Sequence, residues 1–217
     1  MSLQETSITY NDSSYRHFYL CHYLPLSAGV DPLSRSLLKF KRGIQPDLDA
    51  WIENTLEVFH NIPLSPDTII IRALRHDETQ VQQSPPSSVA PSSSLPSSLD
   101  LLGQALSTRF QCQYLPALLC KSRPTLSNKG LTRDQRETEL KNAYNINPEA
   151  LPIPPLPASG TPSHPPFLLI DDILTTGATI RTIIHTLHQA FPLSLLQIFT
   201  LARADYGPSG PPFHVLS

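Results

Sequence analysis

Cysteine, glycine and charged residues are all scarce in this sequence of 217 residues. The three cysteines, Cys21, Cys112 and Cys120, are an odd number, lie far apart and form no C-x-x-C pair. This spacing argues against a disulfide framework and against a structural zinc site, and it fits a reducing compartment. Only 16% of the residues are charged and the formal net charge is -2, so the composition disfavours direct binding to nucleic acid.

Long hydrophobic runs are missing as well. No apolar stretch approaches the ~20 residues that a membrane-spanning helix requires. The polar N-terminus, MSLQETSITYNDSSYRH, lacks the hydrophobic region of a secretion signal. The sequence therefore predicts a cytoplasmic protein without a membrane partner.

The chain length suits one α/β domain with small additions. We divide it into an N-terminal segment (residues 1–32), a domain (33–205) and a C-terminal tail (206–217). The 23 prolines far outnumber the 8 glycines and gather in two places. Residues 84–98 are almost entirely Ser and Pro, which predicts a disordered insertion, and residues 147–166 are expected to form an extended, Pro-rich linker.

Between these segments, apolar spacing and capping residues predict alternating helices and strands. Asp47 is expected to cap a helix over residues 48–59 whose apolar face contains Leu48, Ile52, Leu56 and Phe59. The other predicted helices cover residues 34–42, closed by Gly43, then 100–110, 179–191, and 132–144 as a polar helix or flap. The predicted strands cover residues 68–74, 113–120, 167–170 and 195–204. Alternation of this kind favours an α/β fold, a parallel sheet flanked by helices.

One segment combines the features of a binding site. Residues 167–170 (FLLI) resemble a central strand buried on both faces, and two acids, Asp171 and Asp172, follow at its carboxyl end. Open α/β sheets place their ligands at this edge. The sequence then continues through Ile173 and Leu174 into TTGAT, residues 175–179, at the start of a helix.

The chemistry of this segment matches a ribose 5-phosphate. A Thr- and Gly-rich turn at a helix N-terminus offers free backbone N–H groups and hydroxyls to a phosphate, without requiring Arg or Lys. Two ionised carboxylates accept hydrogen bonds, as the 2'- and 3'-hydroxyls of a ribose would donate them. The predicted phosphate- and ribose-binding residues are Asp171, Asp172, Leu174, Thr175, Thr176, Gly177, Ala178 and Thr179.

A lone Asp-Asp pair is more often a solvated strand end. Here four apolar residues, two acids, two apolar residues and TTGAT stand in strict order, and at every position they resemble the signature that binds 5-phosphoribosyl 1-pyrophosphate (PRPP) in type I phosphoribosyltransferases. A P-loop would need G-K-[ST] and a dinucleotide site would need G-x-G-x-x-G, and neither follows.

Two further blocks resemble the ComF (competence protein F, or amidophosphoribosyltransferase-like) family. They are SLLKFKRG (36–43) and RPTLSNKGLTRDQRETELKNAY (123–144), so the resemblance spans about residues 33–205. It departs at Asn128, where the family usually has Gln, and at Glu139, where it usually has Asn. Residues 1–32 also lack the zinc module that many members carry.

This resemblance implies a type I phosphoribosyltransferase fold with a small N-terminal helical or hood region. It implies transfer of phosphoribose to an unassigned nitrogen nucleophile, with Asp171 and Asp172 as catalytic residues. Mg²⁺ would be bound mainly through PRPP, with no direct protein ligand. A homodimer is the expected assembly.

The resemblance also implies a pyrophosphate site after the strand over residues 68–74, formed by Arg72, Ala73, Leu74 and Arg75. Lys121 and Arg123 are expected to belong to a flexible loop that closes over the leaving group. All four cations are equally compatible with ordinary solvated charge.

Two other functions remain open at this stage. The chain lacks a recognisable base-specificity segment after residues 195–204, and its tail offers only Tyr206 and Phe213 for stacking on a base. A PRPP-binding regulator without catalysis is therefore one alternative. A DNA-uptake (competence) accessory protein, implied by the family alone, is the other.

Overall fold

The computed structural model describes residues 1–24, 31–79, 96–126, 133–151 and 165–205. Its centre is a six-stranded sheet in which β1 pairs antiparallel with β2 and all other neighbours are parallel. In spatial order the strands are β1 (Gln4–Tyr10), β2 (Ser13–Tyr23), β8 (Leu196–Ala204), β7 (Phe167–Leu174), β3 (Ile69–Arg72) and β4 (Gln113–Tyr114). The expected fold class, a parallel sheet flanked by helices, is confirmed.

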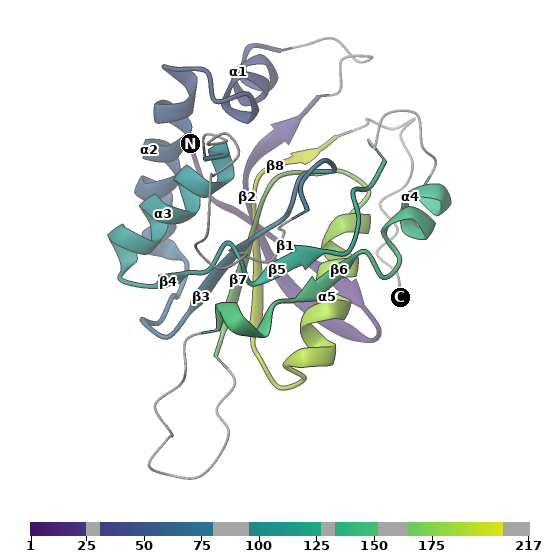
Figure 1. The fold of residues 1–217 in the computed structure, drawn as a ribbon. Coiled ribbons are helices and arrows are strands. Elements are labelled where there is room, and N and C mark those ends of the chain that lie inside the picture. Colours follow the sequence, from purple (N-terminus) through teal and green to yellow (C-terminus); the bar gives the residue numbers. More distant parts are fainter. Residues whose placement is uncertain (25–30, 80–95, 127–132, 152–164, 206–217) are drawn as a thin grey trace, which may run out of the picture.

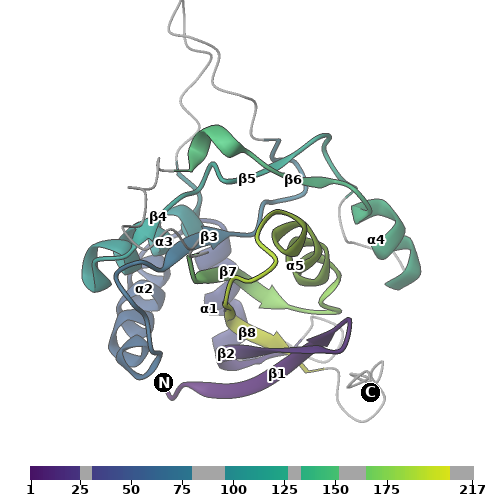
Figure 2. The same cartoon turned by 90° about the horizontal axis from the view of Figure 1, so that it is seen from below.

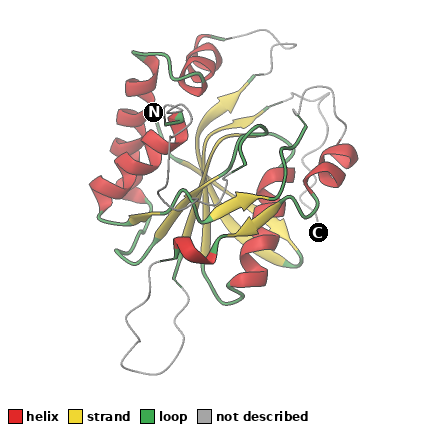
Figure 3. Cartoon of the chain, in the orientation of Figure 1, coloured by secondary structure: helices red, strands yellow, loops and turns green. Residues whose placement is uncertain are grey.

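Helices cover both faces of this sheet (Figures 1 and 2). One face carries α1 (Pro32–Lys41), α2 (Asp47–Val58) with the short helix η2 (Phe59–Asn61), and α3 (Ser98–Phe110). The other carries α5 (Ala178–Ala190) and a small antiparallel sheet of β5 (Leu119–Lys121) and β6 (Tyr144–Ile146), flanked by α4 (Arg133–Leu140) and the short helix η3 (Pro148–Ala150). Figure 3 shows the central strands between these helical layers.

The central strand β7 explains both hydrophobic cores. Phe167 and Leu169 pack with α5, while Leu168 and Ile170 pack with α1, α2 and α3, and all four side chains are buried. Alternate residues of a strand point to opposite faces, so a continuous apolar run is what a strand covered on both sides requires.

The N-terminal residues do not form the separate segment or helical hood that the sequence predicts. Residues 4–23 fold into the β1–β2 hairpin, and β2 joins the main sheet by parallel pairing with β8. Asn11 and Asp12 connect the hairpin with φ values of 46° and 62°, which is the left-handed backbone of a two-residue type I′ turn. The Asn-Asp pair was the signal for this hairpin, and the polar residues of β1 concealed it.

Helix α2 begins one residue earlier than expected, and the face that it buries differs from the predicted apolar face. Asp47 is inside its first turn, where it accepts from Lys39, and no side chain caps the helix. Its fully buried positions are Leu48, Trp51, Thr55 and Val58. Trp51, the single tryptophan of the chain, sets the orientation of α2 because it is the largest of the fully buried side chains.

Two other predicted segments have different boundaries. Most of the insertion at 84–98 lies outside the described residues, but Ser97 forms a capping box with Asp100 and Ser98 begins α3, so order starts earlier than predicted. The strand expected over residues 113–120 is divided by the turn at Pro116 into β4 and β5, which belong to different sheets.

The Pro-rich linker and the tail are described only in part. The linker starts with η3, and its residues 152–164, like the tail 206–217, lie outside the described residues. No helix in the described part of the chain is long and apolar enough to cross a membrane.

Gly103 fixes the distance between α3 and β4. A Cβ built on Gly103 would lie 2.7 Å from Cζ of Tyr114, whose hydroxyl donates to Asp100 at 2.7 Å.

We expect Gly103→Ala to lower the free energy of unfolding by about 1–3 kcal/mol, despite the better helix propensity of Ala, because the ring must move and its hydrogen bond must break. Urea unfolding measures the change. Gln104→Ala, at an exposed position of the same helix, is the control, and equal stability of both variants to wild type would contradict the packing argument.

Candidate functional site

Strand β7 extends further than expected and carries the two acids within it. Its pairing with β3 ends at Ile170, but its pairing with β8 continues through Asp171 to Leu174. The chain after β3 turns away at Ala73, so one edge of β7 is open where the acids lie. The acids therefore belong to the carboxyl-terminal half of a strand rather than to a following loop.

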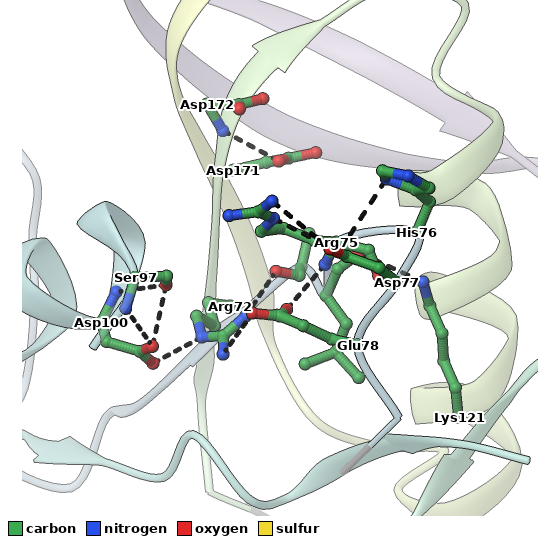
Figure 4. Close-up of polar contacts among 12 residues, drawn as sticks. Arg72, Arg75, His76, Asp77, Glu78, Ser97, Asp100, Lys121, Asp171 and Asp172 are labelled. Carbon is green, nitrogen blue, oxygen red and sulfur yellow. Dashed lines mark hydrogen bonds and ion pairs between the residues drawn. The ribbon is translucent and has the colours of Figure 1, made fainter. Parts of the chain in front are cut away.

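Main-chain hydrogen bonds orient both carboxylates. Asp171 Oδ1 accepts from the backbone N–H of Asp172 at 2.8 Å (Figure 4), and Asp172 Oδ1 accepts from the N–H of Ile173 at 2.7 Å. The second oxygen of Asp172, Oδ2, lies 2.6 Å from Lys41 Nζ. Both carboxylates are therefore held before any ligand arrives.

The two acids sit in different electrostatic surroundings. Burial and the adjacent Asp172 carboxylate raise the pKa of Asp171 well above its usual range, although the Lys41 ammonium acts in the opposite direction. Burial lowers the pKa of Lys41, but the charges of Asp172 and Asp171 outweigh it and leave the pKa raised. Asp171 is thus suited to hold or accept a proton, beside an Asp172 that is paired with an ammonium.

The loop after β7 leaves hydrogen-bond donors available. Thr175, Thr176 and Gly177 form a bend, and Gly177, with φ of 74°, is the residue before α5. No side chain caps α5 and its first turn contains no acid. Within the described part of the chain, no hydrogen bond engages the hydroxyls of Thr175, Thr176 or Thr179. Such a turn can surround an anion with N–H and O–H groups.

A cation lies beside this loop, although the sequence analysis required none. A Cβ on Gly177 would be 3.1 Å from Nη1 of Arg181 and 3.6 Å from Leu174 Cδ1. The Arg181 guanidinium therefore folds back over Gly177 from one turn into α5. Position i+4 after the loop glycine was the available signal, because residues four apart on a helix are neighbours.

Arg72 does not face the predicted pyrophosphate site. Its side chain is 6% exposed and lies 2.7 Å from Glu78 Oε2, with Asp100 on its other side. Asp100 also accepts from Tyr114 Oη. A guanidinium engaged by two carboxylates in this way is structural, and the partner from α3 was not visible in the local sequence.

Ala73, Leu74 and Arg75 form the beginning of a braced loop. Lys121 Nζ donates to the carbonyls of Arg75 at 2.6 Å and Leu74 at 3.3 Å, and Tyr144 Oη donates to Leu74 O at 3.2 Å. The N–H of Ala73 bonds to Ile170 O. These contacts fix the loop from the interior, whereas the Arg75 guanidinium is 53% exposed, beside Asp77, and points toward the acids in Figure 4.

The two cations predicted for a flexible loop have different positions. Lys121 lies in β5 and is buried, so its assignment to a flexible loop is wrong. Arg123 follows β5 and pairs with Glu139 at 2.8 Å, and Glu139 also accepts from the N–H of Leu126. Asn128 and the neighbouring residues 127–132 lie outside the described residues.

Among the described residues, no three His, Cys, Asp or Glu side chains gather as a metal site. Mg²⁺ is commonly bound through one or two carboxylates together with the oxygens of a phosphorylated ligand.

These features define an α/β protein with a parallel sheet, an acidic strand end and an uncapped Thr/Gly loop. Over 105 residues the chain is 29% identical to competence protein F of Haemophilus influenzae, a match that covers 48% of this chain and 42% of that protein. Weak sequence similarity to competence protein F is thus confirmed, and the match spans less than half the length of that relative. No family model matches the chain.

Solved adenine phosphoribosyltransferases are similar to the chain at low identity. The Trypanosoma brucei enzyme, in complex with AMP, pyrophosphate and ribose-5-phosphate, matches with a TM-score of 0.43 and 11% identity over 91% of this chain and 89% of that chain. The Leishmania tarentolae enzyme matches with a TM-score of 0.40 and 12% identity over 87% of this chain and 91% of that chain.

Lys121 makes stability depend on pH. Burial lowers its pKa from 10.5 to about 8, although Glu78 and Asp77 oppose the shift. The unfolded chain keeps this proton to higher pH than the folded chain, so stability rises as pH increases from about 8 to 10.5 and is lost again as pH falls from 10.5 to about 8, with a slope of up to about 1.4 kcal/mol per pH unit.

We expect Lys121→Met to remove this pH-dependent contribution to the free energy of unfolding. The stability of wild type should therefore increase with pH relative to that of the variant over that interval. Urea unfolding across the pH range measures it. Lys141→Met, at an exposed position, should follow the wild-type profile. A Lys121→Met profile parallel to wild type would contradict the assignment.

Proposed function

We propose that this chain binds PRPP and transfers its phosphoribosyl group to a nitrogen nucleophile, releasing pyrophosphate. One observation carries the proposal: the acids of β7 and the open loop at residues 175–179 lie in sequence at the same edge of the sheet. The first offers acceptors to a ribose diol, and the second offers donors to a 5-phosphate. Weak similarity to competence protein F agrees with it.

The 5-phosphate is assigned to the loop residues 175–179 and the start of α5. Their backbone N–H groups and threonine hydroxyls would donate to its oxygens, and the partial positive charge of the helix N-terminus favours a dianion there. The Arg181 guanidinium, folded over Gly177, adds a full positive charge at the same place.

The ribose is assigned to Asp171 and Asp172, and the pyrophosphate to the loop that begins at Ala73. Of the cations predicted there, Arg75 is the exposed one, and Arg72 and Lys121 instead hold the loop in shape. Mg²⁺ bound to the pyrophosphate would supply charge neutralisation for the leaving group. The chain's own residues would orient the anomeric carbon toward the nucleophile.

In the transfer, a nitrogen lone pair forms a bond to the anomeric carbon while the bond from that carbon to pyrophosphate breaks. Pyrophosphate leaves with the bonding electron pair, and the nitrogen loses a proton. Asp171 is the candidate acceptor of this proton because burial raises its pKa. Both carboxylates would stabilise positive charge that develops on the ribose.

A PRPP-binding protein without catalysis is the second candidate, and a specific observation favours it. Two of the four cations expected around pyrophosphate, Arg72 and Lys121, are buried in structural contacts. Pyrophosphate release from PRPP and Mg²⁺, measured with purine, pyrimidine, amide and ammonia acceptors, separates the two candidates. Turnover with any acceptor supports the transferase, and tight binding without any turnover supports the regulator.

We expect Asp171→Asn combined with Asp172→Asn to weaken PRPP binding by at least about 100-fold, because two charge-assisted hydrogen bonds to the ribose become neutral ones. Isothermal titration calorimetry measures the affinity. Asp49→Asn with Asp67→Asn, two exposed acids of which one lies in α2 and the other just before β3, is the matched control. Normal PRPP binding by the Asp171/Asp172 variant would refute the site.

A further inference from the structure

Helix α1 brings a lysine to the acidic strand end. Leu37 and Phe40 are fully buried against the core and anchor the helix, and the hydroxyl of Ser98 in α3 donates to Phe40 O. Lys41 follows as the last residue of α1, where the helix ends and the chain turns at Gly43. Its Nζ reaches Asp172 Oδ2 at 2.6 Å.

The neighbouring lysine of the same turn has a different partner. Lys39 Nζ lies 3.2 Å from Asp47 Oδ2, an ion pair that joins α1 to α2. The two lysines are similarly exposed, at 54% for Lys39 and 50% for Lys41, and their partner carboxylates are similarly shielded, at 16% and 15%. The Lys39–Asp47 pair therefore resembles the Lys41–Asp172 pair in exposure and serves as its control, away from the acids of β7.

We propose that Lys41 is a positioning residue of the ribose site, which holds the Asp172 carboxylate in place and offsets its charge so that an anionic sugar phosphate can bind. This inference rests on the proposed function. In Asp172, Oδ1 accepts from the Ile173 N–H and Oδ2 accepts from Lys41. Each oxygen keeps one lone pair, so the carboxylate retains two acceptor sites for the vicinal hydroxyls of a ribose.

Charge balance gives a second reason for the lysine. Two adjacent carboxylates would repel a ligand that bears a phosphate and a pyrophosphate. The Lys41 ammonium cancels one of them while leaving its acceptor oxygens in place. Half of the Lys41 side chain is exposed, whereas the Asp172 side chain is 15% exposed.

The decisive experiment compares Lys41→Met with Lys39→Met in calorimetric titrations with ribose 5-phosphate and with PRPP. We expect Lys41→Met to lower the affinity for both ligands by about tenfold, which corresponds to about 1.4 kcal/mol of binding free energy. Lys39→Met should bind both as wild type does. Loss of PRPP affinity alone would overturn the proposal, because it would make Lys41 a direct pyrophosphate ligand rather than a residue that acts through Asp172.

A double-mutant cycle tests the route through Asp172. In an Asp172→Asn background, Lys41→Met should cause little further loss of affinity for ribose 5-phosphate. A full, additive tenfold loss in that background would overturn the proposal. Thermal unfolding of each variant checks that differences in binding do not arise from unfolded protein.

A titration without ligand separates failure of this inference from failure of the proposed function. The charged and titratable groups around the Asp171 carboxyl are Asp172, Lys41, Arg75, Lys121 and Tyr144. Carboxyl ¹³C NMR should show a higher pKa for Asp171 in Lys41→Met than in wild type, and no change in Lys39→Met. If wild type binds neither ligand, the proposed function falls. If Lys41→Met leaves the Asp171 pKa unchanged, the proposed electrostatic coupling of Lys41 to the acids is refuted.

Discussion

The open edge of β7 is the constraint on which the site depends. Strand β3 pairs with β7 only as far as Ile170, whereas β8 pairs with it to Leu174. The last half of β7 therefore has one partner strand and one accessible edge. The Asp171 and Asp172 carboxylates lie next to each other on this part of the strand, and Lys41 of α1 pairs with Asp172.

Much of the polar chemistry near this edge shapes the protein rather than contacting a ligand. Arg72 lies between Glu78 and Asp100, and Lys121 binds the carbonyls of the loop that β3 enters. Burying such charges is costly unless every one of them is paired and hydrogen-bonded, and here they are. The result is a loop whose backbone is held in place before a ligand binds.

The sequence was sufficient where a feature depends on neighbours in the chain. The order of strand, acids, loop and helix over residues 167–191 was predictable, because hydrophobic runs, a loop glycine and a 3.6-residue period are all local signals. The predictions that failed concern partners distant in sequence. The sequence near Arg72 does not indicate that Asp100 forms an ion pair with it, and the sequence near Lys41 does not indicate that α1 ends beside Asp172. The N-terminal hairpin was missed although the Asn-Asp turn is a local signal, because the polar residues of β1 concealed the strand pattern.

The central claim is that a phosphoribosyl ligand binds at the carboxyl end of β7 and the start of α5. Titration of PRPP into ¹⁵N-labelled protein, followed by amide NMR, tests it most directly. We predict that the largest shifts appear at residues 171–179, with smaller ones in the loop after β3. Saturable binding that shifts amides elsewhere, such as those of α3 and β4, while residues 171–179 stay unchanged would contradict the account.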